Sequence, residues 1–263
     1  MDVQLFSSLT SGKPEIFTTI FQHIRLFTEN VSLIFSPTGL YFQTMDSSRV
    51  SIVELTLPNT WFDKYTFTSK TDIVLGIPTA ILFKILNARE KQQRIQFLYD
   101  NSDALAIHFT SDDTSIFDKH FECPLMDLET DIMNIPEIEY SAEFTLPSAI
   151  FSTLIQQLKT FGDTLDIECT EEHIQLAAKS SESGTMSVQV NIDDLNSFSI
   201  NEGEQLHMSF SLIQLHQICM FNKVAKELMV SLCKEYPLSI LYPITDDETT
   251  HLKLFLAPKI KDD

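Results

Sequence analysis

The chain has 263 residues, of which 43% are hydrophobic and 21% are charged, a composition typical of folded globular protein that excludes a low-complexity or disordered chain. Its 37 acidic and 18 basic residues give a formal net charge of −19, which argues against a protein that binds nucleic acid over its whole surface. No run approaches the roughly 18 apolar residues of a membrane span, and MDVQLFSSLT lacks the features of a signal peptide, so we expect a soluble intracellular protein without a membrane partner.

A twelve-residue phrase occurs twice in the chain. Residues 16–27 read IFTTIFQHIRLF and residues 150–161 read IFSTLIQQLKTF, an ungapped match at a separation of 134 residues. In both copies the apolar residues recur at spacings of one, three and four, which places them on one face of a helix. The opposite face carries Thr, Ser, Gln, His and a single Arg or Lys, without an acidic residue. The phrase therefore predicts two similar amphipathic helices.

Strand-like alternation follows each of these helices. VSLIFSPTGLYFQT at 31–44 and LDIECTEEHIQLAA at 165–178 each read as two short strands around a turn. Further helices are predicted at 78–91 and 211–226, displaced from one another by 133 residues. Two helices in each half, surrounded by strands that do not alternate regularly with them, are typical of an α+β fold with antiparallel sheets.

The repeat divides the chain into two similar domains, at 1–124 and 142–263. Between them, LMDLETDIMNIPEIEYS at 125–141 is acidic and is interrupted by Pro136, which is typical of a connector lying along the surface. Met133 and Ile135 are apolar residues of this connector. Because the segment around them is acidic, they are hard to explain as ordinary core residues.

Residue types that perform catalysis or hold metals follow no recognised pattern in this chain. The four cysteines are isolated, and we expect them to be reduced core thiols. The seven histidines form no i, i+4 pair and no HExxH, and the sequence contains no P-loop, GxGxxG or GxSxG. Adjacent acids such as Asp112 and Asp113 are typical of solvated loops. The sequence therefore predicts no enzyme, no metal and no cofactor.

Charge is distributed unevenly between the predicted helices and the rest of the chain. The windows 18–27, 78–91, 147–162 and 211–226 contain one acidic residue, Glu90, where an even spread would place about eight. The same windows contain seven basic residues, which are Arg25, Lys84, Arg89, Lys91, Lys159, Lys223 and Lys226. Ordinary solvated helices mix both signs because opposite charges at i, i+4 stabilise them. The exclusion of acids predicts that these surfaces face a polyanion such as a nucleic acid backbone.

Several motifs resemble those of the eukaryotic-type DNA sliding clamps of the proliferating cell nuclear antigen family. The segment GLYFQTMDSSRVSIVELTL at 39–57 is similar to that family's signature. DNSDALAIHF at 100–109, the connector at 125–141 and HLKLFLAPKI at 251–260 agree with it in order along the chain. The resemblance implies two similar domains per chain, with inner helices and outer antiparallel sheets. It also implies that three chains close into a ring around DNA and that the ring performs no chemistry.

The resemblance further implies an apolar pocket for partner proteins under the connector. Partners of the family insert a short peptide with a glutamine, then an aliphatic residue, then two aromatic residues. The matching positions here are Met45, Val50, Ile52, Met133, Ile135, Pro237, Phe255, Ala257, Pro258 and Ile260. For Ile52 an ordinary core role is about equally consistent with the sequence.

Contacts between subunits are implied at two edge strands, at about 115–123 and 183–190. The candidate apolar residues there are Phe117, Phe121, Met186 and Val188. Pairing two edges would also remove strands that are otherwise prone to aggregate.

This chain departs from the family at several positions. Neutral residues occupy places where the family usually has a base facing DNA, namely Thr18, Thr19, Thr153, Gln156 and Met220. The usual tyrosine of the pocket is Phe255, and the lysine that cellular members use for ubiquitin-type modification aligns with Glu171. We therefore expect a thinner basic lining than in the family and the loss of that modification.

The resemblance implies partners and a location as well. The partners are duplex DNA, DNA polymerase and other replication or repair proteins with a clamp-binding peptide, a clamp loader, and further copies of the chain. The expected location is the nucleus or, for a viral clamp, the site of viral DNA replication. The alternative is a clamp-like scaffold or a checkpoint-type ring subunit that does not support processive synthesis.

Overall fold

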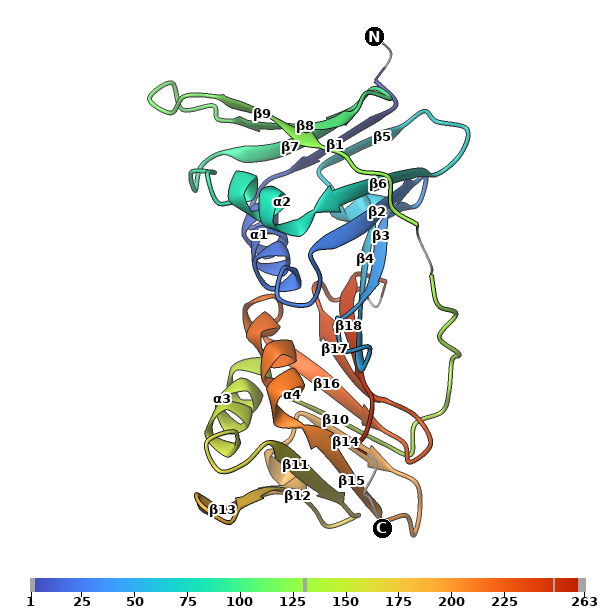
Figure 1. Cartoon of the computed structure of the whole chain (residues 1–263), viewed down its shortest axis with the longest axis vertical. Helices are drawn as coiled ribbons and strands as arrows, with labels where there is room; N and C mark the ends of the chain where they lie inside the picture. Colours follow the sequence, from blue (N-terminus) through green and yellow to red (C-terminus); the bar gives the residue numbers. More distant parts are fainter. Residues whose placement is uncertain (1–2, 130–131, 248, 260–263) are drawn as a thin grey trace. The chain divides into compact units, whose positions relative to one another are not determined.

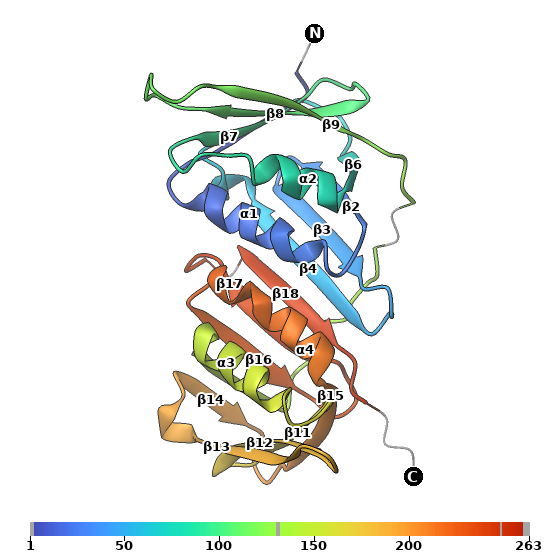
Figure 2. The ribbon, with the colours of Figure 1, turned by 60° about the vertical axis from the view of Figure 1, so that its left-hand side comes forward.

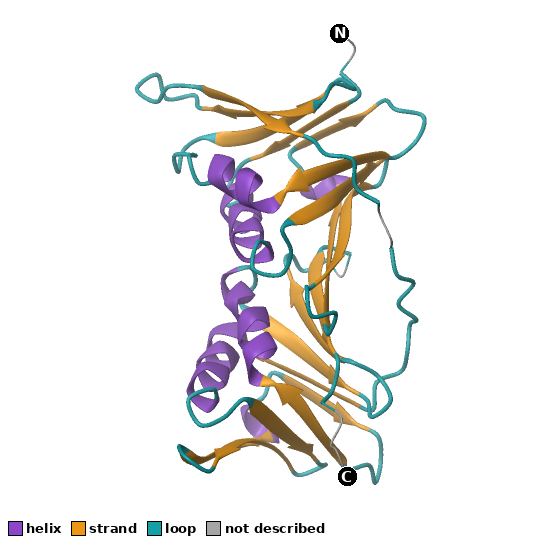
Figure 3. Cartoon of the chain, viewed as in Figure 1, coloured by secondary structure: helices purple, strands orange, loops and turns teal. Residues whose placement is uncertain are grey.

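The computed structural model describes residues 3–129, 132–247 and 249–259. It divides into two compact units. Unit 1 comprises Met1–Ser47, Glu54–Met133 and Asp246–His251, and unit 2 comprises Ser48–Val53, Asn134–Thr245 and Leu252–Asp263. The division at Met133 falls inside the predicted connector. Figure 1 shows the path of the chain, and Figure 3 shows helices on one side and strands on the other within each unit.

Two helices lie side by side in each unit (Figure 2). They are α1 (Lys13–Ile24) and α2 (Thr79–Leu86) in unit 1, and α3 (Ser148–Leu158) and α4 (Leu212–Cys219) in unit 2. Short 3₁₀ turns are present at Asn59–Trp61, Ile192–Asp194 and Met220–Lys223. The observed helix pairs confirm the predicted pairs, and α4 begins and ends 133 residues after α2.

The helix ends differ from the predicted windows. α1 begins three residues earlier than predicted, after Gly12, whose φ of 86° is a left-handed conformation that glycine adopts without strain. α2 ends at Leu86 rather than near 91, and α4 gives way to a 3₁₀ turn at Met220. The carbonyls of Asn222, Ala225 and Lys226 lie 2.6–3.1 Å from the hydroxyl of Ser148, which holds this irregular segment against α3.

Unit 1 contains strands in two antiparallel layers. One sheet has the order β5-β1-β7-β8-β9, and strands β4-β3-β2-β6 form the other layer. The bounds are β1 (Leu5–Leu9), β2 (Asn30–Ser36), β3 (Gly39–Met45), β4 (Ser51–Pro58), β5 (Lys64–Phe67), β6 (Ile73–Pro78), β7 (Arg94–Tyr99), β8 (Ala104–Thr110) and β9 (Lys119–Pro124).

Unit 2 repeats this arrangement strand for strand. Its layers have the orders β14-β10-β16-β17-β18 and β13-β12-β11-β15, in which every strand number exceeds its counterpart in unit 1 by nine. The bounds are β10 (Ala142–Pro147), β11 (Thr164–Cys169), β12 (His173–Ser180), β13 (Gly184–Asn191), β14 (Ser197–Ile200), β15 (Leu206–Ser211), β16 (Glu227–Leu232), β17 (Leu238–Pro243) and β18 (His251–Leu256). The twelve-residue repeat of the sequence therefore belongs to a duplication of the whole unit.

Each helix pair buries its apolar face against the sheets. In α1, Phe17 and Phe21 are fully buried, and their rings lie 5.3 Å and 5.8 Å from those of Phe97 and Phe42. In α3, the equivalent face buries Phe151, Ile155 and Leu158. Burial of such side chains stabilises a fold by about 1.5–3 kcal/mol each. Most of the apolar half of the repeated phrase is thus core, and most of its polar half remains at least partly exposed. Two residues differ from the prediction: Ile150 of the apolar face is 54% exposed, and His23 of the polar face is buried.

The connector begins against β6 in unit 1. The backbone N–H of Met126 donates to the carbonyl of Gly76 at 2.9 Å, and a Cβ at Gly76 would lie 2.2 Å from the carbonyl oxygen of Met126. Unit 2 has an equivalent bond from the N–H of Lys259 to the carbonyl of Ser209 at 2.7 Å. At Gly76 itself, a Cβ would overlap the connector backbone, so glycine leaves room for this approach of the connector to β6.

Gly76→Ala should displace the start of the connector and lower the free energy of unfolding by about 1–3 kcal/mol, because the added carbon overlaps backbone. Denaturant titration and hydrogen exchange of the Met126 amide measure the two effects. Val74→Ala changes an exposed residue of the same strand and serves as the control. Wild-type stability and exchange in the Gly76 variant would contradict this account.

Candidate nucleic-acid interface and partner site

Two predicted basic residues lie on the exposed helix surface of unit 1. Arg25 caps the end of α1, where its Nε donates to the carbonyl of Gln22 at 3.0 Å, and its guanidinium lies 4.6 Å from the centre of the Phe83 ring on α2. Lys84 is exposed in the last turn of α2. An aromatic ring holds a cation in place without neutralising its charge, because the ring carries no net charge of its own. Arg25 and Lys84 therefore offer two positive charges on adjacent helices.

The prediction for Arg89 is corrected by the structure. Its side chain is only 7% exposed, and Nη2 forms an ion pair with Glu15 at 2.6 Å. Nη1 donates to the carbonyls of Glu90, Lys91 and Gln93 at 2.8–3.0 Å. Because α2 ends at Leu86, Arg89 lies in the following turn and holds that turn together. Because Nη1 and Nη2 both bond within the unit and the side chain is nearly buried, Arg89 is poorly placed to contact phosphates.

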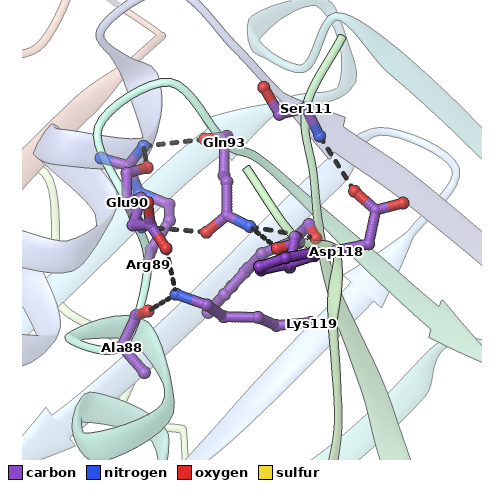
Figure 4. A network of polar contacts seen from close by, with 9 residues as sticks. Ala88, Arg89, Glu90, Gln93, Ser111, Asp118 and Lys119 are labelled. Carbon is purple, nitrogen blue, oxygen red and sulfur yellow. Dashed lines mark hydrogen bonds and ion pairs between the residues drawn. The ribbon is translucent and has the colours of Figure 1, made fainter. Parts of the chain in front are cut away.

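Neighbouring polar contacts attach the same turn to strand β9 (Figure 4). Lys119 at the start of β9 donates to the carbonyl of Ala88 at 2.9 Å and to the carboxylate of Glu90 at 2.8 Å. The Gln93 side chain donates to the carbonyl of Phe117 at 2.8 Å. Glu90, the one acid in the predicted windows, is thus paired with Lys119. Lys91 is exposed in this turn, outside the helix in which it was predicted.

The three basic residues predicted in unit 2 are all exposed near helix ends. Lys159 caps the end of α3, Lys223 ends the 3₁₀ turn after α4, and Lys226 follows it. Burial and the charge of Lys159 lower the pKa of His216 on α4, which favours the neutral imidazole. α2, α3 and α4 contain no acidic residue. The acid that α1 adds, Glu15, lies outside the predicted window and is paired with Arg89.

The neutral residues of the predicted lining are all partly or fully exposed. Thr18 and Thr19 are half-buried on α1, and Met220 is half-buried after α4. Thr153 is exposed on α3, but its hydroxyl donates to the carbonyl of Ala149 at 2.8 Å, and Gln156 is exposed beside it. The helix surfaces therefore combine few positive charges with neutral polar groups.

Seven residues of the predicted partner pocket belong to unit 2. Val50, Ile52, Ile135, Pro237, Ala257 and Pro258 are half-buried, whereas Phe255 is only 5% exposed. The N–H of Ala257 donates to the carbonyl of Val50 at 2.9 Å, which joins the segment after β18 to the segment before β4. Lys253 places its ammonium 5.1 Å from the centre of the Phe255 ring. Partly exposed apolar side chains from four separate parts of the sequence thus occur in one unit.

The other three pocket residues lie elsewhere. Met45 and Met133 are half-buried in unit 1, and Ile260 lies outside the described residues. The main chain of Met133 is held by the side chain of Gln43, at 2.8 Å and 3.1 Å. The sequence prediction missed Gln43, although it lies in the signature segment two residues before Met45.

The predicted subunit contacts lie at two strands that end their sheets. β9 pairs with β8 and β13 pairs with β12, and neither has a second partner among the described residues. Phe117 is 83% exposed just before β9, and Phe121 is half-buried with its ring 5.2 Å from that of Phe109. Met186 and Val188 are half-buried on β13. Two edge strands with apolar residues are therefore available for pairing.

The cysteines are free, as the sequence predicts. Cys123, Cys169 and Cys219 are buried and Cys233 is half-buried. Burial raises the pKa of Cys123 and Cys169 to about 11, which keeps both thiols protonated. Within residues 3–129, 132–247 and 249–259, no group of three or more His, Cys, Asp or Glu side chains is arranged to hold a metal ion. The helices in these ranges are all too short or too polar to cross a membrane.

Comparison with protein families matches nearly the full chain. The family model described as the N-terminal domain of proliferating cell nuclear antigen matches residues 9–133, and the model of the C-terminal domain matches residues 134–259. The chain belongs to the proliferating cell nuclear antigen family. The resemblance and the α+β clamp fold predicted from the sequence are thereby confirmed. Like the family, the chain is a DNA sliding clamp, a polymerase processivity factor in DNA replication and repair.

Family membership also settles coarser points about partners. Proteins of this family are non-enzymatic scaffolds that encircle DNA, recruit polymerase and other proteins, and assemble as oligomers of like chains. The two family models meet between residues 133 and 134, where the structure also divides into its two units.

Proposed function

We propose that three copies of this chain close head to tail into a ring, through pairing of β9 on one copy with β13 on the next. The observation that supports this is the repeat of the strands. In unit 2, β18 lies next to Ser51–Val53, the first residues of β4. The repeat makes β9 the counterpart of β18 and β13 the counterpart of β4. β9 and β13, the strands with an unpaired edge among the described residues, are therefore the counterparts of β18 and β4, which already meet within unit 2.

This pairing is heterologous, because two different edges of the chain meet. A heterologous contact makes a closed ring if the rotation between copies closes, and an open filament otherwise. Three copies with two units each would give six repeats of one sheet-and-helix unit. Phe117, Phe121, Met186 and Val188 would contribute the apolar part of each contact.

The ring would hold duplex DNA through weak contacts that do not depend on base sequence. Arg25, Lys84, Lys91, Lys159, Lys223 and Lys226 are the cations proposed for the lining, and Arg89 is omitted because of its ion pair. Lys and Arg contacts to phosphates fix position without reading bases. A thin lining allows sliding, since each phosphate that is neutralised adds to the affinity.

Partner proteins would bind through the apolar residues Met45, Val50, Ile52, Met133, Ile135, Pro237, Phe255, Ala257, Pro258 and Ile260. DNA polymerase and a clamp loader are the proposed partners, and the clamp performs no catalysis of its own. It would act in the nucleus or, for a viral clamp, at the site of viral DNA replication. No observation favours the alternative of a ring subunit without processivity activity.

The purified chain should have a solution mass of three times 30.0 kDa by light scattering. Phe117→Ser should shift it toward the monomer, because an exposed aromatic group loses its apolar contact at the edge. Val74→Ser alters another exposed apolar strand residue and should leave the mass unchanged. A wild-type chain that stays monomeric at micromolar concentration would contradict the ring.

Reversing charge with Arg25→Glu and Lys84→Glu together should shorten the products of primer extension several-fold without changing the mass of the ring. Carboxylates in place of two cations would repel the phosphates of the duplex. Lys70→Glu, which changes an exposed lysine outside the helices, is the matched control. Full processivity of the double variant would remove these residues from the lining.

Ile135→Ala together with Phe255→Ala should weaken binding of a peptide with the family's glutamine, aliphatic and paired aromatic residues by about 2–4 kcal/mol. Isothermal titration measures the change. Phe255 is almost fully buried, so thermal unfolding must accompany each titration, and Glu137→Ala in the connector controls for general effects. An unchanged Kd in a folded double variant would place the peptide elsewhere.

A further inference from the structure

Met133 lies in the connector, between strands β9 and β10. There the side-chain amide of Gln43 bonds its main chain in both directions. The N–H of Met133 donates to Oε1 of Gln43 at 2.8 Å, and Nε2 of Gln43 donates to the carbonyl of Met133 at 3.1 Å. The two bonds copy the pattern of a hydrogen-bonded pair in an antiparallel ladder. One side chain thus replaces the neighbouring strand that the connector lacks at this residue.

Two further residues orient the Gln43 amide. Its Nε2 also lies 3.3 Å from the hydroxyl of Tyr41 and 3.3 Å from Oε2 of Glu54. The Tyr41 hydroxyl itself donates to Oε2 of Glu54 at 2.9 Å. Burial, and then the charge of Glu54, raise the pKa of Tyr41 well above its usual value, so the phenol remains a donor. Both neighbours present acceptors to Nε2, which leaves Oε1 facing the N–H of Met133.

The residues of this network come from adjacent strands. Tyr41 and Gln43 are two residues apart in β3 and therefore share one face of it, and Glu54 lies on the neighbouring strand β4. The sheet thus holds the Gln43 amide in place. The connector is therefore bonded to unit 1 at Leu125 by the carbonyl of Asp103, at Met126 by Gly76 and at Met133 by Gln43. Ile132, next to Met133, remains 52% exposed.

We infer that Gln43 is a positioning residue for partner binding, which fixes the main chain of the connector at Met133 before a partner peptide arrives. The inference rests on the proposed function of the connector as part of the partner site. Ordering a free segment on binding costs conformational entropy, and a segment that is already held avoids most of that cost. Gln43 would raise partner affinity through the connector, by a contact that the partner itself does not make.

The test compares Gln43→Ala, Gln43→Glu and Tyr41→Phe with Gln96→Ala, which alters a half-buried glutamine on strand β7. Hydrogen exchange of the Met133 amide measures how firmly Gln43 holds the connector. Titration with the family-type peptide measures the affinity for a partner. In both Gln43 variants the Met133 amide should exchange at least tenfold faster. Both should bind the peptide about tenfold more weakly, the scale of one to two lost hydrogen bonds. Gln43→Glu should be the weaker binder, because its carboxylate faces Glu54 and the Met133 carbonyl. Tyr41→Phe should have a smaller effect on both measurements.

Three results would overturn the inference. A wild-type exchange rate of the Met133 amide in Gln43→Ala would show that the Gln43 side chain does not hold the connector. Faster exchange with an unchanged peptide Kd would show that the Gln43–Met133 bonds have no role in partner binding, while the partner site itself would stand. A wild-type chain that binds no such peptide would overturn the proposed partner site and this role together, whatever the exchange rates.

Discussion

Unpaired backbone groups at the ends of β-sheets are the constraint on which this structure depends. A strand at an edge exposes a row of N–H and C=O groups that invites another strand to pair. In unit 2, the edge of β18 is covered by Ser51–Val53 from the start of β4. The repeat leaves β9 and β13, their counterparts, with one partner each among the described residues. Duplication of one unit thus produces two complementary edges, which is the requirement for a ring of identical chains.

The charge pattern is consistent with that assembly. The chain carries a net charge of −19, yet α2, α3 and α4 contain no acid, and the acid of α1 is neutralised by Arg89. Helices that face DNA must exclude carboxylates, whereas an acidic exterior repels stray nucleic acid within the screening length of roughly 8 Å at physiological salt. Few cations on the helices favour sliding over tight binding. In the proposed ring, the same asymmetry would serve both encirclement and movement.

Much of this molecule was predictable from the sequence, because the informative patterns are local and repeated. Helical spacing gave the apolar faces of α1 and α3, and the 133-residue displacement of the second helix pair matched α2 and α4. The failures involve partners that are distant in sequence. The sequence places Arg89 among the DNA-facing cations, but its ion pair with Glu15 joins residues 74 apart. It gives no sign of Gln43, whose bonds to Met133 join residues 90 apart. Spacing alone carries no information about such contacts.

Topological retention on DNA tests the central claim most directly. The protein would be loaded onto nicked circular duplex, the circle would be isolated by gel filtration, and half of it would then be linearised with a restriction enzyme. A closed ring stays on the circle and slides off the linear ends, so retention should be lost only after cutting. Equal retention on circular and linear DNA would show ordinary binding to the backbone and would contradict encirclement.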